Sequence, residues 1–396
     1  MSKAKIYLDY AAATPMDPSV KKSMEPYLSD HFYNPSSLYA AARFSKAELE
    51  ATRGRLSQIL GSKPSEVVFT AGGTESVNLA ILGVARKFAG SRVIASAIEH
   101  EAVLESLKLL QNEGHATQLV PVKRNGIIDT QTMASAIDDQ TVLVSVMYAN
   151  NEIGTIQPIS KIADLVEAIK KDRLKRGIEL PLYLHTDAAQ AAGYLDLHVS
   201  RLRVDLLSLN GSKIYGPKQT GLLYVRTGVQ LQAQVVGGGQ ERGRRSGTEN
   251  LAGAVGLATA LELVQSKRQS ESKRLVGLRQ ELIKAAKKLG GVLNGDATKR
   301  LAGNVNLTFD GIDGEQAVFY FDEAGFEIST GSACAAASEE PSHVLLAIGL
   351  SAQQASSSLR FTMGSGTSPQ DIELLTKALP GLVKRLRQLA KTSQGH

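Results

Sequence analysis

The chain has 396 residues, of which 43% are hydrophobic and 21% are charged, and its formal net charge is +6. This composition is typical of a folded globular protein. The sequence has no run of 18 apolar residues, and no signal-type apolar block follows Met1. We therefore expect a cytoplasmic protein without membrane contact. Because lysines and arginines are dispersed and tryptophan is absent, direct nucleic-acid binding is excluded, and acidic small molecules or phosphate are the expected partners.

Between residues 66 and 225, short apolar runs alternate with amphipathic segments, a pattern typical of a parallel sheet covered by helices. The expected strands are residues 66–70, 92–96, 116–120, 141–147, 182–186, 204–209 and 221–225. The expected helices are residues 74–88, 101–112 and 159–171. We therefore predict a large α/β domain with a seven-stranded, mostly parallel sheet.

A different pattern begins at about residue 250, where two long helical stretches are expected to follow one another. Short strands are then expected at 304–309 and 358–363, with helices at 316–324 and 369–390. These elements predict a smaller α+β domain. We place the large domain at residues 15–262 and the small domain at 263–396, completed by the N-terminal segment 1–14.

The first candidate site residues follow the first two expected strands. In the run from Thr70 to Ser76, a strand passes through two glycines into a helix, and the free backbone N–H groups there are suited to a phosphate, although a plain helix cap is the alternative. Gly73 and Thr74 are the candidate ligands. His100 ends the next strand, where its ring would stack on a flat cofactor and move protons, or else cap a helix.

Three more candidates follow later strands. The amide of Asn151 is suited to a phenolic oxygen or a carboxylate, although paired asparagines also make turns. Asp187 ends an apolar strand at the edge where such sheets bind ligands, and it would pair with a cationic ring nitrogen or cap a turn. Lys213 lies among glycines and a proline, in the fixed position that a Schiff-base lysine needs, although a lone lysine is usually solvated.

The C-terminal half adds a loop, a thiol and a guanidinium. Residues 237–248 are rich in glycine, basic and hydroxyl side chains, which suits either phosphate binding or a flexible hairpin. The only cysteine, Cys334, excludes an intramolecular disulfide and stands among tiny residues that favour a reactive thiol over a packed one. Arg360 lies in an alternating strand, and its planar guanidinium fits the carboxylate of an amino acid unless it is merely an exposed strand residue.

Several of these blocks occur together in a fixed order. They are Tyr7–Pro15, Asn34–Ser37, Thr74–Ser76, Asn150–Gly154, His185–Asp187, Lys213 with Gly216–Lys218, Arg245–Thr248 and Gly331–Cys334. With these blocks, the chain resembles over nearly its whole length the pyridoxal 5'-phosphate (PLP)-dependent cysteine desulfurases of the iron-sulfur and nitrogenase type. These enzymes belong to the class V aminotransferases of fold type I.

The resemblance implies a role for each candidate residue. Lys213 would hold PLP covalently, Asp187 would pair with the ring nitrogen, Gln190 would bond the ring hydroxyl and His100 would stack on the ring. The phosphate would contact Gly73, Thr74, Asn210, Ser212 and, from the second subunit of a homodimer, Thr248. Asn151 and Arg360 would hold the carboxylate of L-cysteine.

The resemblance also implies the reaction. Lys213, with help from His100, would move the α-proton of L-cysteine, and Cys334 would attack the substrate sulfur. The products would be L-alanine and a persulfide on Cys334, which would pass to a sulfur-acceptor protein or thiol in iron-sulfur cluster assembly or tRNA thiolation. No metal is implied.

Two departures keep alternatives open. Asn210 and Ser212 stand where the family usually has serine and histidine, so we expect PLP to bind, but more weakly than usual. A selenocysteine lyase or another class V enzyme is one alternative, and a noncatalytic interaction protein with the same fold is another.

Overall fold

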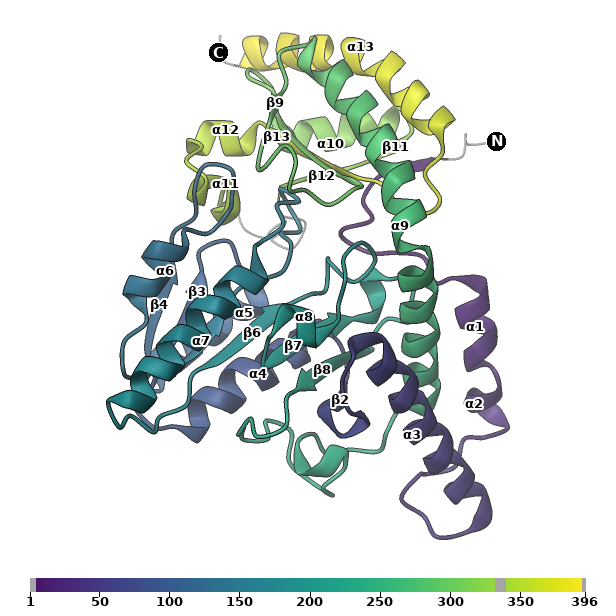
Figure 1. The fold of residues 1–396 in the computed structure, drawn as a ribbon. Coiled ribbons are helices and arrows are strands. Elements are labelled where there is room, and N and C mark those ends of the chain that lie inside the picture. The colour runs from purple at the N-terminus through teal and green to yellow at the C-terminus, as the bar shows by residue number, and fades with distance from the viewer. Residues whose placement is uncertain (1–4, 332–339, 394–396) are drawn as a thin grey trace.

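A seven-stranded sheet forms the centre of the larger part of the structure (Figure 1). The structure is a computed structural model and describes residues 5–331 and 340–393. The strands, in the order of the sheet, are β2 (Val67–Thr70), β8 (Gly221–Val225), β7 (Leu206–Asn210), β6 (Tyr183–Asp187), β5 (Thr141–Ser145), β3 (Arg92–Ser96) and β4 (Ala116–Val120). Only β8 runs antiparallel to its neighbours. The predicted seven-stranded, mostly parallel sheet is therefore confirmed.

Helices cover both faces of this sheet. One face carries α4 (Gly73–Lys87) and α5 (Glu101–Asn112), and the other carries α3 (Ala40–Leu60), α6 (Thr130–Ala136) and α7 (Ile159–Lys175). In α7, for example, Ile159, Ile162, Ala163 and Val166 are buried at the spacing of one helix face. Because both faces are covered, the central strands are buried throughout, as in parallel sheets generally.

The two helical stretches expected after residue 250 are one continuous helix, α9 (Leu251–Lys287). Its first half packs Leu257 and Leu261 into the core beside the large sheet, and its second half packs Leu275 and Leu282 into a separate core (Figure 1). The apolar periodicity pauses between these halves, where the helix bridges two cores and exposes polar side chains. The expected break between two helices is therefore wrong, because a polar stretch without proline does not end a helix.

A second, four-stranded antiparallel sheet lies beside the second core. Its order is β12 (Ser329–Thr330), β13 (Ser358–Thr362), β10 (Asn304–Thr308) and β9 (Val292–Leu293), and α10 (Gly314–Glu323) and α13 (Pro369–Ser393) pack nearby. The N-terminal strand β1 (Ile6–Tyr7) pairs in parallel with β11 (Phe326–Glu327). The division into domains at residues 15–262 and 263–396 stays a prediction.

The remaining elements are short. They are α1 (Pro18–Met24), α2 (Pro26–Ser29), α8 (Val199–Leu202), α11 (His343–Ala347), α12 (Ala352–Ser356) and the single-turn helices η1 (Pro64–Glu66), η2 (Gly211–Lys213) and η3 (Glu241–Gly243). Among the helices of the described residues, none is long and apolar enough to cross a membrane.

Candidate functional site

A cavity of about 230 Å³ lies at the carboxyl edge of the large sheet, and Arg360 of β13 and Ala11 of the N-terminal segment close it. Because β3, β5, β6 and β7 run parallel, the residues at their carboxyl ends meet at this edge. The lining includes the predicted site residues Gly73, Thr74, His100, Asn151, Asp187, Gln190, Asn210, Lys213 and Arg360.

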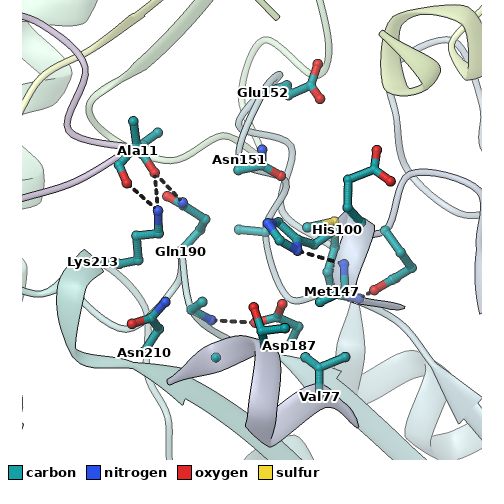
Figure 2. Close-up of a pocket in the computed structure, with 18 of the residues that line it drawn as sticks. Ala11, Val77, His100, Met147, Asn151, Glu152, Asp187, Gln190, Asn210 and Lys213 are labelled. Carbon is teal, nitrogen blue, oxygen red and sulfur yellow. Dashed lines mark hydrogen bonds between the residues drawn. The ribbon is translucent and has the colours of Figure 1, made fainter. Parts of the chain in front are cut away.

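Lys213 ends η2, a turn held by bonds from Gly211 N–H to Thr220 O and from Gly216 N–H to Gly211 O. Its ammonium group donates to Ala11 O at 3.0 Å and to Ala12 O at 2.5 Å (Figure 2). Gln190 Nε2 also donates to Ala11 O, at 2.9 Å. The N-terminal segment therefore orients both side chains on one wall of the cavity.

Asp187 ends β6 and is buried at the base of the cavity. Its Oδ1 accepts a hydrogen bond from Ala189 N–H at 2.9 Å. Burial raises the pKa of this carboxyl above its ordinary value, although His100, the Ala189 N–H and Lys213 oppose the rise. A cationic group placed against Asp187 would favour its ionised form, and this is the chemistry that a protonated ring nitrogen offers.

His100 caps α5 and also lines the cavity, so the cap is present while the stacking and proton-transfer role stays a prediction. Its Nδ1 accepts from Ala102 N–H at 3.0 Å, which assigns the proton of the neutral ring to Nε2. Figure 2 shows the ring on the side of the cavity opposite Lys213. The backbone therefore fixes one nitrogen of the imidazole, and the ring lines the cavity.

The expected phosphate site begins at the N-terminus of α4. A Cβ atom on Gly73 would lie 3.2 Å from Cβ of Asn210, so glycine allows the helix start and the end of β7 to approach closely. The hydroxyl-bearing Thr74 is exposed. Asn210 Oδ1 accepts from the N–H and Oγ of Ser212, at 3.1 and 3.0 Å. Ser212 itself does not line the cavity, but the Asn210 side chain that accepts its hydrogen bonds does.

Arg360 crosses from β13 into the opposite end of the cavity, with only 2% of its side chain exposed. Its Nη2 pairs with Asp9 at 2.8 Å, and its Nη1 lies 3.4 Å from both Asn151 O and Gly331 O. Nε is buried without a hydrogen-bond partner among the described residues. Since a buried donor without a partner is costly, this end of the cavity is suited to an anion.

Four further titratable residues line the cavity and were not predicted, namely Glu99, Glu101, Glu152 and His343. Glu99 Oε1 accepts from Met147 N–H at 2.7 Å, Oε2 has no partner in the described structure, and burial raises the pKa of the carboxyl well above its ordinary value. His343 lies 3.3 Å from Glu101. The sequence could have indicated both Glu99 and Glu152 as site residues, because each is next to a predicted one: Glu99 precedes His100 and Glu152 follows Asn151.

Besides Ser212, two predicted residues are not placed at this cavity. Thr248 is exposed and lines a different cavity of about 210 Å³, together with Thr70, Arg245 and Glu249. Cys334 belongs to residues 332–339, outside the described part of the chain. Within the described part, no group of three histidine, aspartate or glutamate side chains is arranged to hold a metal ion.

A family model, related sequences and solved structures all indicate the same protein family. The family model described as "Aminotransferase class-V" matches residues 6–375. A cysteine desulfurase IscS from Clostridium botulinum is 42% identical over 97% of this chain and 96% of its own length. A solved structure titled "NIFS-LIKE PROTEIN" has a TM-score of 0.86 at 29% identity, covering 98% of this chain and all of the other. A second, titled "SspA in complex with cysteine", has a TM-score of 0.78 at 37% identity over 91% and 99%.

Proposed function

The chain belongs to the class V aminotransferase family and is a PLP-dependent cysteine desulfurase, and we propose that the cavity around Lys213 is where PLP and L-cysteine react. The observation that carries this proposal is the meeting of an oriented lysine amine, a buried carboxylate and a buried arginine at one cavity. The predicted fold, the fold type I architecture with its large mostly parallel sheet, is confirmed by the same comparisons.

The residues present fit PLP. Asp187 would face the ring nitrogen, Gln190 the ring hydroxyl and His100 one face of the ring, while Lys213 would hold the cofactor covalently. Gly73, Thr74 and Asn210 would bind the phosphate at the N-terminus of α4, where backbone N–H groups and the helix dipole favour an anion. When bound, PLP supplies an electron-withdrawing ring that stabilises negative charge on the carbon bearing the substrate amine.

The substrate carboxylate would bind between Arg360 and Asn151. Among the described residues, the buried Nε of Arg360 has no hydrogen-bond partner, and a carboxylate oxygen would supply the acceptor. Held there, L-cysteine would present its Cα hydrogen toward the Lys213 amine, which would accept the α-proton. His100 would assist by donating or accepting a proton at Nε2.

Sulfur would leave the substrate by attack of the Cys334 thiolate on the substrate sulfur. The Cβ–S bond of L-cysteine breaks, an S–S bond to Cys334 forms, and Cβ takes a proton, so that L-alanine leaves without an external oxidant or reductant. Gly331, three positions before Cys334, lies 3.4 Å from Arg360 through its carbonyl oxygen. Three residues of chain reach about 11 Å, so covalent geometry allows the thiol to approach the substrate.

We also propose a homodimer in which Thr248 of one subunit contacts the phosphate bound by the other. Large apolar side chains are exposed around α2 and the start of α3, with Leu28 63%, Phe32 68% and Leu38 87% exposed. Such a patch supports burial against a second copy. Sedimentation velocity is expected to give the mass of two chains.

The persulfide would then pass to an acceptor protein or thiol, in a cytoplasmic location where thiols stay reduced.

The function is tested against the other activities of the class V group by varying the substrate. With PLP, L-cysteine and a thiol reductant, we expect the protein to release sulfide. With L-alanine and a 2-oxo acid, we expect no amino-group transfer. A reactive thiol is needed to remove sulfur and is not needed for transamination, so Cys334 favours the first reaction over the second. A protein that transaminates and releases no sulfide would contradict the proposal, and a strong preference for L-selenocysteine would reassign the substrate.

A further inference from the structure

The wall of the cavity beside Asn151 contains a carboxyl group, Glu152, to which the reaction above gives no role. Asn150 Oδ1 accepts from the N–H groups of both Glu152 and Ile153 at 2.9 Å, which fixes the turn after β5. Figure 2 shows the Glu152 side chain next to that of Asn151 at one end of the cavity. The turn therefore holds this carboxyl at the end where the substrate carboxylate would bind.

The Glu152 carboxyl is closely packed. Its residue is 2% exposed, and its Oε2 accepts a hydrogen bond from Ser342 Oγ at 2.5 Å. A Cβ atom built on Gly331 would lie 2.9 Å from the same oxygen. Burial of this kind disfavours a charged carboxylate, because little water can solvate it.

The charged groups that face Glu152 do not compensate for this burial. Arg360 from β13 and His100 at the start of α5 favour the ionised form, whereas Glu101 of α5 opposes it. Arg360 is already paired with Asp9, and His343 of α11 lies against Glu101 rather than Glu152. Burial outweighs the hydrogen bond from Ser342 and raises the pKa of Glu152 to about 7.

We propose that Glu152 must carry a proton for a carboxylate ligand to bind beside Arg360, so that substrate binding is coupled to protonation of this side chain. The inference rests on the proposed function, in which Arg360 holds the substrate carboxylate. With Glu152 ionised, the substrate carboxylate would place a second negative charge near it in a buried site whose arginine already pairs with Asp9. Protonated Glu152 removes this repulsion and still accepts the hydrogen bond from Ser342.

The test measures binding of L-alanine to the PLP-bound protein from pH 6 to pH 8.5, followed by cofactor absorbance. L-alanine carries the substrate's carboxylate and no thiol. The dissociation constant of the wild type is compared with that of Glu152→Gln, whose amide stays neutral, so that pH effects shared by both proteins cancel. If only the protonated form binds and its pKa is about 7, the ratio is expected to be near one at pH 6 and about 30 at pH 8.5.

A second variant tests the same proposal even if the Glu152→Gln protein does not fold. Because the Ser342 hydrogen bond lowers the pKa of Glu152, Ser342→Ala should move the loss of L-alanine affinity to higher pH. Glu105→Gln is the control. It removes an exposed carboxyl from α5, the helix that carries Glu101, and should leave the pH profile unchanged. A purely structural role for Glu152 would not produce this pattern.

The outcomes separate the inference from the proposed function. If wild type and Glu152→Gln bind L-alanine with the same pH dependence, or if Ser342→Ala leaves the profile in place, the coupling is wrong while the proposed function stands. If the PLP-bound wild type binds no L-alanine at any pH, both are overturned.

Discussion

Replacement of Lys213 by alanine is expected to lower the rate of L-cysteine desulfuration by at least about 1,000-fold, because the variant loses both the covalent attachment of PLP and the base for the α-proton. In the wild type, the amine is oriented by the carbonyl groups of Ala11 and Ala12. Among the described residues that line the cavity there is no second lysine to replace it. The measurement is sulfide release at saturating L-cysteine, together with borohydride reduction, which should fix PLP to the wild type only.

Lys171→Ala provides the matched control, since this lysine of α7 is exposed and does not line the cavity. It should retain wild-type activity and the borohydride-stable cofactor. The assignment of Lys213 would be contradicted if Lys213→Ala still fixed PLP on reduction or kept its rate of sulfide release.

Cys334→Ala should lose sulfide release almost completely, to below about 1% of the wild-type rate, because the nucleophile that takes the sulfur is gone. The cofactor absorbance and the binding of L-alanine should stay as in the wild type, since none of the residues proposed to hold PLP or the substrate carboxylate lies in residues 332–339. Sulfide release and L-alanine binding are therefore the two measurements to make on one preparation.

Cys334→Ser tests whether the thiol itself or only its size matters. A hydroxyl is a far weaker nucleophile toward sulfur, so this variant should behave like Cys334→Ala. Undiminished sulfide release in either variant would remove the proposed sulfur-transfer step, and loss of L-alanine binding would show that the thiol's segment shapes the cavity.

The strands of the large sheet could be predicted because each is a short apolar run bounded by turn residues, and such runs depend only on local sequence. Helix α3 was not predicted, because its buried positions include Ser45, Thr52, Arg53 and Ser57, which do not form an apolar stripe. Arg53 is buried because it pairs with Glu241, 188 positions away, at 2.7 Å. A partner at that separation cannot be identified from the pattern of α3 alone.

The part of the candidate site that could be predicted consists of residues at the ends of strands. A parallel sheet brings His100, Asn151, Asp187 and Asn210 to one edge, so their convergence follows from topology. The burial of Glu99 and Glu152 could not be predicted, because burial of a carboxyl depends on side chains from distant segments, as Ser342 shows for Glu152. The relation of Thr248 to the phosphate depends on a second subunit and stays a prediction.

The most direct test of the account is a single turnover of the PLP-bound protein with one equivalent of L-cysteine and no reductant. L-alanine is quantified, and the peptide containing Cys334 is weighed by mass spectrometry. We predict equal amounts of L-alanine and of Cys334 peptide carrying one additional sulfur atom. L-alanine formed without sulfur on that peptide, or no L-alanine at all, would contradict the coupling of carbon–sulfur cleavage at Lys213 to sulfur capture by Cys334.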